Sequence, residues 1–259
     1  MSLKHRARVM FEKLCEVHIV QRGRVAPLFE QDHLRQFFHH FAVDCVFDVG
    51  ANAGQYAQML RRELGYKGPI VSFEPIPELA ARLRAQASTD PAWFIEEAAL
   101  DARPGEATLN VLAGDQFSSL HRVSDSGAML FRNQTRLCKR ITVRTSTVAL
   151  ELQKYRERLG FARPFLKMDT QGHDLAVASG GGAELAAFIG LQSELAIKRL
   201  YEDAPGFEEA LDYYRRHGFE VSALVPNNFG HFPRLLEIDC IMYRRDTVDD
   251  PGTAAGLSS

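Results

Sequence analysis

The chain has 259 residues, of which 46% are hydrophobic and 25% charged, and its formal net charge at pH 7 is −2. These values are typical of a globular protein with a substantial core, organised as one large domain or as one domain with an extension. The small net charge gives no electrostatic reason to expect nucleic acid as a partner, and no apolar run has the length of a membrane span.

The four cysteines, Cys15, Cys45, Cys138 and Cys240, form no CxxC pair. Cys45 and Cys240 lie in apolar runs, so we expect them to be buried and reduced, without a disulfide framework. The basic N-terminus is not followed by the apolar stretch and cleavage site of a signal peptide. We therefore expect a cytoplasmic protein, with membrane association through the basic N-terminus as the alternative.

Residues from about 4 to 42 are rich in helix formers, and Pro27 is expected to divide them into two helices. We interpret residues 1–42 as a helical extension that covers the main domain or contacts a partner. The main domain is predicted to occupy residues 43–245. The small and polar residues of 246–259 predict a disordered tail.

The first half of the main domain alternates between strand and helix patterns. Strands are expected at 43–49, 70–74 and 93–95, and helices at about 54–64 and 77–87. This β-α-β-α-β order predicts a parallel sheet with right-handed crossovers, as in a Rossmann-like α/β fold.

The second half begins with two alternating stretches, 107–112 and 141–145, which predict paired edge strands. They carry a long polar loop, 114–136, and long loops in compact domains are often functional. Further on, the patterns predict helices at about 148–159 and 207–217 and strands at 164–168, 190–195, 219–224 and 237–243. The last two strands are expected to form an antiparallel edge of the sheet.

The segment Val46-Phe-Asp-Val-Gly-Ala-Asn-Ala-Gly54 takes a buried strand through a sharp turn into a helix. Gly50 has no side chain, which lets a ligand lie against the backbone, and the helix N-terminus offers free N–H groups to an anion. Glu74 ends the second strand 20 residues after Gly54. A carboxylate there can accept hydrogen bonds from both hydroxyls of a ribose. Together these features predict a nucleoside site at the carboxyl edge of the sheet.

The turn itself indicates which nucleoside is bound. A dinucleotide site requires G-x-G-x-x-G, whereas this turn has two glycines and an acidic residue, Asp48, just before it. A carboxylate suits an ammonium group and the helix end suits a carboxylate, so an amino-acid nucleoside, S-adenosylmethionine, is predicted. The alternatives are a tight turn without a ligand and a nicotinamide-dependent oxidoreductase.

The ordered motifs resemble the FkbM-type family of S-adenosylmethionine-dependent O-methyltransferases over roughly residues 43–243. The motifs are Val46–Gly54, Ser72-Phe-Glu-Pro75, Ala98-Ala-Leu-Asp101, Phe165-Leu-Lys-Met-Asp-Thr-Gln-Gly-His-Asp174, Leu191-Gln-Ser-Glu-Leu195 and Leu236-Glu-Ile-Asp-Cys240. The resemblance implies a seven-stranded, mostly parallel methyltransferase sheet with one antiparallel strand. It also implies methylation of a hydroxyl on a sugar, glycolipid or secondary metabolite.

The resemblance further implies a set of cofactor contacts at the motif positions and their immediate neighbours. The predicted cofactor-binding residues are Asp48, Gly50, Ala51, Asn52, Gly54, Tyr56, Glu74, Pro75, Ala98 and Ala99. One position departs from the family. A glutamate usually stands two residues after the position of Asp169, and this chain has Gln171. If that position helps catalysis, the mechanism or the substrate differs from the family's usual one. Gln171 therefore keeps open the alternative of an inactive cofactor-binding scaffold or assembly factor.

Methyl transfer depends chiefly on alignment of the acceptor, and a hydroxyl acceptor also benefits from a general base. Asp169 ends the fourth strand of the parallel order at the same sheet edge as Glu74, so we expect it to face the methyl group. His173 follows shortly after it, and histidines ordinarily titrate near neutral pH. Glu194 and Lys167 complete the predicted catalytic set.

Three alternatives and the question of a metal stay open at this stage. Asp169 could cap a helix, His173 could be a solvent-exposed helix residue, and Glu194 could pair with Lys198. No metal site is expected, because the spacing of the N-terminal histidines matches no common site. Binding of Mg²⁺ by Asp169 and Glu194 is the less favoured alternative.

Overall fold

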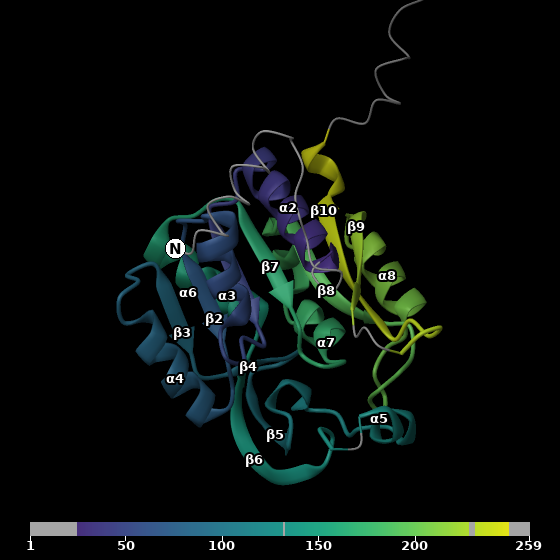
Figure 1. Ribbon diagram of the computed structural model, residues 1–259. Helices are drawn as coiled ribbons and strands as arrows, with labels where there is room; N and C mark the ends of the chain where they lie inside the picture. Colours follow the sequence, from purple (N-terminus) through teal and green to yellow (C-terminus); the bar gives the residue numbers. More distant parts are fainter. Residues whose placement is uncertain (1–24, 132, 228–230, 249–259) are drawn as a thin grey trace, which may run out of the picture.

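The structure is a computed structural model that describes residues 25–131, 133–227 and 231–248. Its centre is a seven-stranded sheet with helices on both faces (Figure 1). In chain order the strands are β1 (Cys45–Val49), β2 (Ile70–Phe73), β3 (Trp93–Glu96), β7 (Pro164–Met168), β8 (Gly190–Ala196), β9 (Phe219–Asn227) and β10 (Glu237–Arg244). The predicted α/β fold with a mostly parallel sheet is thus confirmed.

The strand order in this sheet is β3-β2-β1-β7-β8-β10-β9. β10 runs antiparallel to both β8 and β9, and the other neighbouring strands are parallel. The chain moves outward from β1 to β3 and then returns to place β7 on the other side of β1. Such a reversal leaves a crevice beyond the carboxyl ends of the two central strands, where α/β sheets bind ligands.

Helices cover each face of the sheet. One face carries α2 (Val25–His40), α3 (Gln55–Met59) with its π-helical continuation η2 (Leu60–Leu64), and α4 (Pro77–Ala87). The other carries α6 (Val148–Leu159), α7 (Asp174–Ser179), the 3-10 helix η4 (Gly182–Ala187) and α8 (Phe207–Arg216). Strand residues alternate between two apolar clusters, as period-2 side chains must: Val46 faces the first layer and Phe47 the second.

The described part of the N-terminal region belongs to the core. Phe37 and Phe38 of α2 pack on Phe165 of β7, with ring centroids 5.4 and 5.1 Å apart. Pro27 lies in the first turn of the described helix and does not interrupt it, because backbone N–H groups in a first turn need no helical partner. The helix expected before it lies outside the described residues. So does most of the predicted tail, of which the 3-10 turn η5 (Arg245–Thr247) and Val248 are described.

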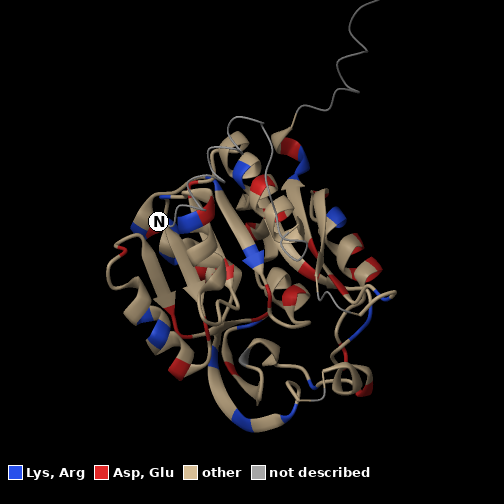
Figure 2. Cartoon of the chain, in the orientation of Figure 1, with Lys and Arg blue, Asp and Glu red and all other residues tan. Residues whose placement is uncertain are grey.

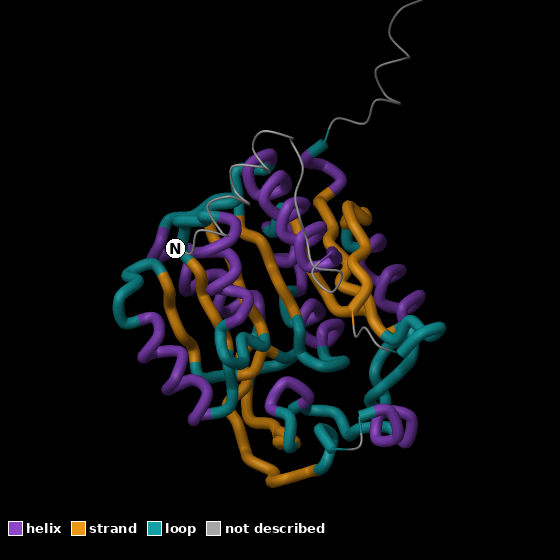
Figure 3. The backbone as a smooth tube through the Cα atoms, viewed as in Figure 1, coloured by secondary structure: helices purple, strands orange, loops and turns teal. Residues whose placement is uncertain are grey.

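The two alternating stretches do pair in antiparallel fashion, as β5 (Gly105–Leu112) and β6 (Leu137–Ser146). They do not extend the main sheet, however. Together with β4 (Ala99–Leu100) they form a separate three-stranded sheet below it (Figure 3). The reason is the apolar face of β5 and β6, which packs on Ile76 and Leu79 at the start of α4. The connecting loop carries η3 (Asp115–Phe117) and α5 (Asp125–Leu130). This small sheet therefore forms a wall beside the carboxyl edge of the main sheet.

The described cysteines agree with the sequence expectation. Cys45 and Cys240 are buried free thiols, and Cys138 is exposed. Burial raises the pKa of Cys240 to about 12, so this thiol stays protonated.

Candidate active site

A cavity of about 390 Å³ opens at the carboxyl edge of the main sheet. The predicted site residues that line it are Gly50, Ala51, Asn52, Tyr56, Glu74, Pro75, Ala98, Ala99, Lys167, Asp169 and His173. Three further predicted residues, Asp48, Gly54 and Glu194, lie outside the lining. The structure therefore brings most of the predicted set together around one space.

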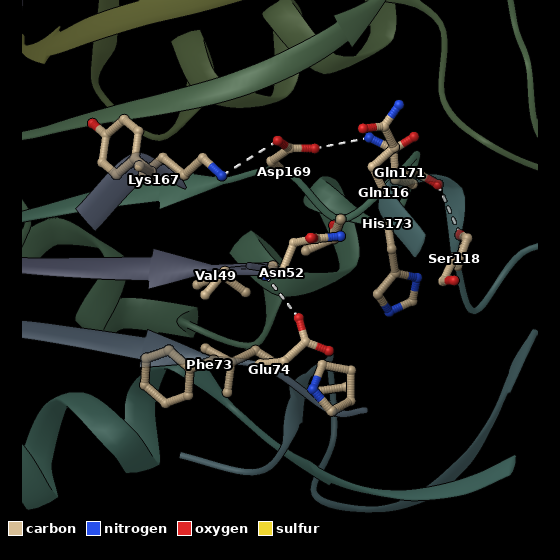
Figure 4. Close-up of a pocket in the computed structure, with 18 of the residues that line it drawn as sticks. Val49, Asn52, Phe73, Glu74, Gln116, Ser118, Lys167, Asp169, Gln171 and His173 are labelled. Carbon is tan, nitrogen blue, oxygen red and sulfur yellow. Dashed lines mark hydrogen bonds and ion pairs between the residues drawn. The ribbon is translucent and has the colours of Figure 1, made fainter. Parts of the chain in front are cut away.

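Glu74 is fixed at the end of β2 by the backbone around it. Its Oε2 accepts a hydrogen bond from the Asn52 N–H at 2.8 Å (Figure 4). Its Oε1 accepts one from the Ile76 N–H at 2.8 Å. The side chain is 4% exposed. Two backbone donors thus hold the carboxylate in one orientation at the cavity wall, next to the glycine turn.

The two glycines of the turn serve the packing of the chain. Both have positive φ, +79° at Gly50 and +83° at Gly54. A Cβ at Gly50 would lie 2.0 Å from the carbonyl oxygen of Asp169, so the end of β7 approaches the turn only because this residue has no side chain. A Cβ at Gly54 would meet Leu83 at 2.8 Å and Trp93 at 3.1 Å. Gly54 therefore allows the helix to pack on α4 and β3, and it lies outside the cavity lining, so its contact with a cofactor stays a prediction.

Asp48 belongs to a polar row that crosses the sheet beneath the cavity. Ser72, Asp48, Lys167 and Gln192 are register partners on four adjacent strands. The Asp48 carboxylate is fully buried, accepts a hydrogen bond from Ser72 Oγ at 2.9 Å and faces Lys167 Nζ at 3.7 Å. Asp48 therefore lies outside the cavity lining, and its contact with a cofactor ammonium stays a prediction. Burial raises the pKa of the Asp48 carboxyl, while the Lys167 ammonium and the Ser72 hydroxyl act against this rise.

Lys167 brings a positive charge to the cavity. Its Nζ lies 3.4 Å from Asp169 Oδ2 and 5.3 Å from the ring centre of Tyr56 (Figure 4). Burial by itself would lower the pKa of this ammonium, but the carboxylates of Asp169 and Asp48 outweigh burial and raise the pKa. The side chain therefore stays charged although it is 7% exposed.

Asp169 faces the cavity with 40% of its side chain exposed. Gln171 Nε2 donates to Asp169 Oδ1 at 2.8 Å and also to Glu194 Oε2 at 3.0 Å. Asp169 does not cap α7, whose N-cap position is His173. Glu194 accepts a further hydrogen bond from Asn227 Nδ2 at 2.8 Å, and an ion pair with Lys198 is not among its contacts in the described part of the chain. Glu194 therefore contacts the site through two lining residues, Gln171 and Asn227.

His173 is enclosed, with 12% of its side chain exposed, and both of its ring nitrogens are engaged. Nε2 lies 3.0 Å from Asp101 Oδ1, and Nδ1 lies 3.1 Å from His121 Nε2. Since a carboxylate only accepts, Nε2 must carry a hydrogen, and in the neutral ring Nδ1 then accepts from His121. Burial, followed by the neighbouring His173, lowers the pKa of His121. This chain of contacts joins the segments that follow β4, β5 and β7.

Several lining residues were not predicted from the sequence. They are Glu30, Gln116, Ser118, Gln192, Asn227 and Asp239 among others. Gln192 and Asp239 belong to two of the motifs named above, Leu191–Leu195 and Leu236–Cys240. Each is a polar residue in a largely apolar strand, and this contrast could have indicated a place in the site. Glu30 lies on α2, where it accepts a hydrogen bond from Gln192 Nε2 at 2.7 Å. A lone glutamate on a helix far from the motifs carries no such signal.

Carboxylates predominate around the cavity. Glu30, Glu74, Asp169 and Asp239 line it, whereas the lysine that lines it, Lys167, is already paired. Figure 2 shows acidic positions near several strand ends beside the basic position at the end of β7. Burial raises the pKa of Glu30 and of Asp239, and for Asp239 the carboxylate of Glu30 adds to the rise. Burial thus favours the protonated form of Glu30 and Asp239, in which each side chain can donate as well as accept a hydrogen bond.

Two negative observations apply to residues 25–131, 133–227 and 231–248. No helix there combines the length and apolar character needed to cross a bilayer. Within the same residues, no group of three or more His, Cys, Asp and Glu side chains is arranged to hold a metal ion.

The strand order of the main sheet and the glycine turn beside Glu74 are those of an α/β protein of the methyltransferase class. The family model described as the Methyltransferase FkbM domain matches residues 48–221. This match spans more than half of the chain, so the chain belongs to the FkbM methyltransferase family, and its cofactor is S-adenosylmethionine. Comparison with curated proteins found no match.

Solved structures of similar fold include proteins with quite different acceptors. Magnesium protoporphyrin IX methyltransferase from Synechocystis PCC 6803, with bound S-adenosylmethionine, is 11% identical over 94% of this chain and 98% of that one, with a TM-score of 0.45. Fibrillarin from Aeropyrum pernix, also with S-adenosylmethionine, is 12% identical over 76% of this chain and 66% of that one, with a TM-score of 0.42. A putative rRNA methylase from Clostridium thermocellum is 12% identical over 83% and 96%, with a TM-score of 0.42. At these values the likeness says nothing about the acceptor of this chain.

Proposed function

We propose that this chain transfers a methyl group from S-adenosylmethionine to a hydroxyl of a sugar, glycolipid or secondary metabolite. The observation that carries the proposal is the setting of Asp169. This carboxylate is partly exposed in the cavity, with one oxygen held by the Gln171 amide and the other beside the Lys167 ammonium. A carboxylate held in this way can accept the proton that a hydroxyl loses when it is methylated.

The lining residues fit the cofactor. Glu74 can accept hydrogen bonds from ribose hydroxyls, and the small Ala98 and Ala99 leave room beside it for a flat ring. At the other end of the cavity, Lys167 suits a carboxylate, while Glu30 and Asp239 suit an ammonium group. This set replaces Asp48, which lies beneath the floor, as the expected binder of the amino-acid end.

When bound, the cofactor supplies a methyl group activated by its sulfonium. The protein must then align the acceptor, which can contribute ~7–11 kcal/mol, and take its proton, which can contribute roughly 10²–10⁴-fold in rate. We assign the proton to Asp169 rather than His173, because both nitrogens of His173 are engaged by Asp101 and His121. His173 then serves to fasten the loops around the cavity, and Lys167 to hold Asp169 charged.

The charge of the cavity supports a neutral or cationic acceptor. A phosphate-bearing acceptor would bring negative charge next to Asp169 and next to two carboxyl groups, Glu30 and Asp239, whose ionisation burial already disfavours. Hydrogen-bonding side chains from Gln116, Ser118 and Asn227 suit a molecule with several hydroxyls. These features favour a sugar-like acceptor over nucleic acid.

Two experiments test the proposal. Calorimetry with S-adenosylhomocysteine should show binding, with NAD and NADP much weaker. A mass-detected assay should then find transfer of one methyl group to neutral or amino sugars and polyols, with phosphorylated sugars and short RNAs as controls. Methylation of RNA in preference to sugars would sink the acceptor assignment. Binding without methylation of any acceptor, including extracts of the source cells, would favour an inactive scaffold.

A further inference from the structure

We propose that Gln171 is a positioning residue for methyl transfer, whose amide stands between Asp169 and Glu194 where a cation would otherwise be needed. The inference rests on the proposed function, since it concerns how the base of that reaction is held. It starts from two distances: Gln171 Nε2 lies 2.8 Å from Asp169 Oδ1 and 3.0 Å from Glu194 Oε2. A primary amide nitrogen carries two hydrogens, so each carboxylate receives one.

The amide has a third partner. The hydroxyl of Tyr201, which is 3% exposed, lies 2.7 Å from Gln171 Oε1 and 3.1 Å from the carbonyl oxygen of Phe117. The reversed amide would place its carbonyl oxygen against the two carboxyl groups. The orientation with the NH₂ group toward Asp169 and Glu194 is therefore the favoured one.

The backbone of Gln171 is held as firmly as its side chain. Its φ of +55° is in the left-handed region, which non-glycine residues rarely adopt. Its carbonyl oxygen accepts a hydrogen bond from Ser119 Oγ at 2.8 Å. Ser119 belongs to the loop after β5, and Tyr201 follows β8. Two segments from outside the β7 motif therefore fix the amide, which cannot swing away from the carboxylates without breaking these contacts.

The arrangement has an electrostatic consequence. Burial raises the pKa of Glu194, and the nearby Asp169 carboxylate raises it further. The Gln171 NH₂ group donates to both carboxyl groups, and the partial positive charge of its hydrogens offsets this repulsion. On the other side, Lys167 Nζ lies 3.4 Å from Asp169 Oδ2. Asp169 is thus held from both sides, with its remaining surface toward the cavity.

Gln171→Glu is the diagnostic substitution, because it introduces the glutamate that usually stands here in the family, keeps the shape of the side chain and replaces the NH₂ donor by a third carboxylate group. Three carboxylates at one point form a donor set that suits a divalent cation. The variant should therefore lose the bridge and gain affinity for Mn²⁺. Gln153→Glu is the matched control. The Gln153 amide also donates to a carboxylate, Glu157 at 3.2 Å, but on the exposed face of α6.

The experiment compares wild type, Q171E, Q153E and Tyr201→Phe in three measurements. Turnover of Q171E should fall roughly 10²-fold, as expected when a reacting group is misplaced, and the acidic limb of its pH–rate profile should move to higher pH. Affinity for S-adenosylhomocysteine should stay within about twofold of wild type. Tyr201→Phe, which keeps the buried ring, should lose about two- to tenfold in turnover, the equivalent of one neutral hydrogen bond.

The third measurement does not depend on activity. Calorimetric titration with Mn²⁺ alone should show binding to Q171E and none to wild type or Q153E. Absence of Mn²⁺ binding by folded Q171E would overturn the idea that the amide occupies the place of a cation. Unchanged turnover and pH profile in both Q171E and Tyr201→Phe would overturn the positioning role. If wild type methylates no hydroxyl, the proposed function and the catalytic role fail together, while the Mn²⁺ titration still decides on the bridge.

Discussion

The two ends of the cavity are built in different ways. At the end formed by β1 and β2, Glu74 and Asn52 come from two short motifs and are held mainly by backbone hydrogen bonds. At the end formed by β7, β8 and β10, charged side chains meet from segments as far apart in sequence as Glu30 and Asp239. The first end presents one oriented carboxylate, and the second presents a network in which charges balance one another.

This difference determines how each end responds to substitution. A change at Glu74 is expected to remove contacts to a ligand, and within the protein it removes two hydrogen bonds from backbone N–H groups, those of Asn52 and Ile76. A change at Lys167 leaves Asp48 without its counter-charge at 3.7 Å, beneath the floor of the cavity. We therefore expect the first end to act mainly on cofactor affinity, and the second end, which also faces the amino-acid part of the cofactor, to act on turnover and stability as well.

The largest expected effect is on turnover at the second end. Asp169→Asn keeps the size of the side chain but removes the proton acceptor, so turnover should fall roughly 10²–10⁴-fold with little change in affinity for S-adenosylhomocysteine. Steady-state kinetics and calorimetry measure the two quantities. His173→Ala is the comparison and should cost about tenfold or less, because this ring has no free nitrogen for the acceptor. If His173→Ala instead shows the larger loss and the acidic limb of the pH profile vanishes, His173 is the base.

The second effect is on stability. Lys167→Met should lower the free energy of unfolding by about 3–5 kcal/mol, because it leaves buried Asp48 without its counter-charge. Urea unfolding measures this loss. The double variant with Asp48→Asn should be more stable than the sum of the two single changes implies. Strict additivity would show that the two charges do not interact across the strands.

The third effect separates the two ends most directly. Glu74→Ala should weaken binding of S-adenosylhomocysteine by about 1.5–3 kcal/mol, the usual worth of hydrogen bonds to a charged group. Calorimetry measures it. Glu97→Ala is the control, because its exposed carboxylate pairs with Arg84 outside the cavity and should leave affinity unchanged. Equal losses in both variants would mean that Glu74 acts through general stability rather than through the ligand.

The smallest effect concerns pH. Burial raises the pKa of Glu30 above its ordinary value of 4.5, so the folded chain keeps this proton to higher pH than the unfolded chain. The contribution of Glu30 to stability is therefore greatest below pH 4.5 and is lost as the pH rises through the folded-state pKa. Glu30→Gln should gain stability relative to wild type between about pH 4 and about pH 7 in urea unfolding. The exposed Glu157→Gln should show no such trend, and a trend of opposite sign in Glu30→Gln would contradict the assignment.

The sequence predicted the elements of the fold because each depends on local patterns. The apolar runs of 43–49 and 164–168 and the helical spacing after Gly54 identify strands and helices without reference to distant residues. The order of these elements then led to a mostly parallel sheet. The small sheet of β4, β5 and β6 was mistaken for an edge of the main sheet, because alternation reveals that one face is covered but not what covers it.

For the site, the sequence by itself determined the positions that lie at strand ends. Glu74, Asp169 and the turn at Gly50 were found because a parallel sheet brings its carboxyl ends to one edge. Only the tertiary structure decided which polar residues become neighbours. Strand order and register set Asp48 beside Lys167, and helix packing brings Glu30 over Gln192. These contacts join segments whose spacing in sequence carries no period, so no local pattern could predict them.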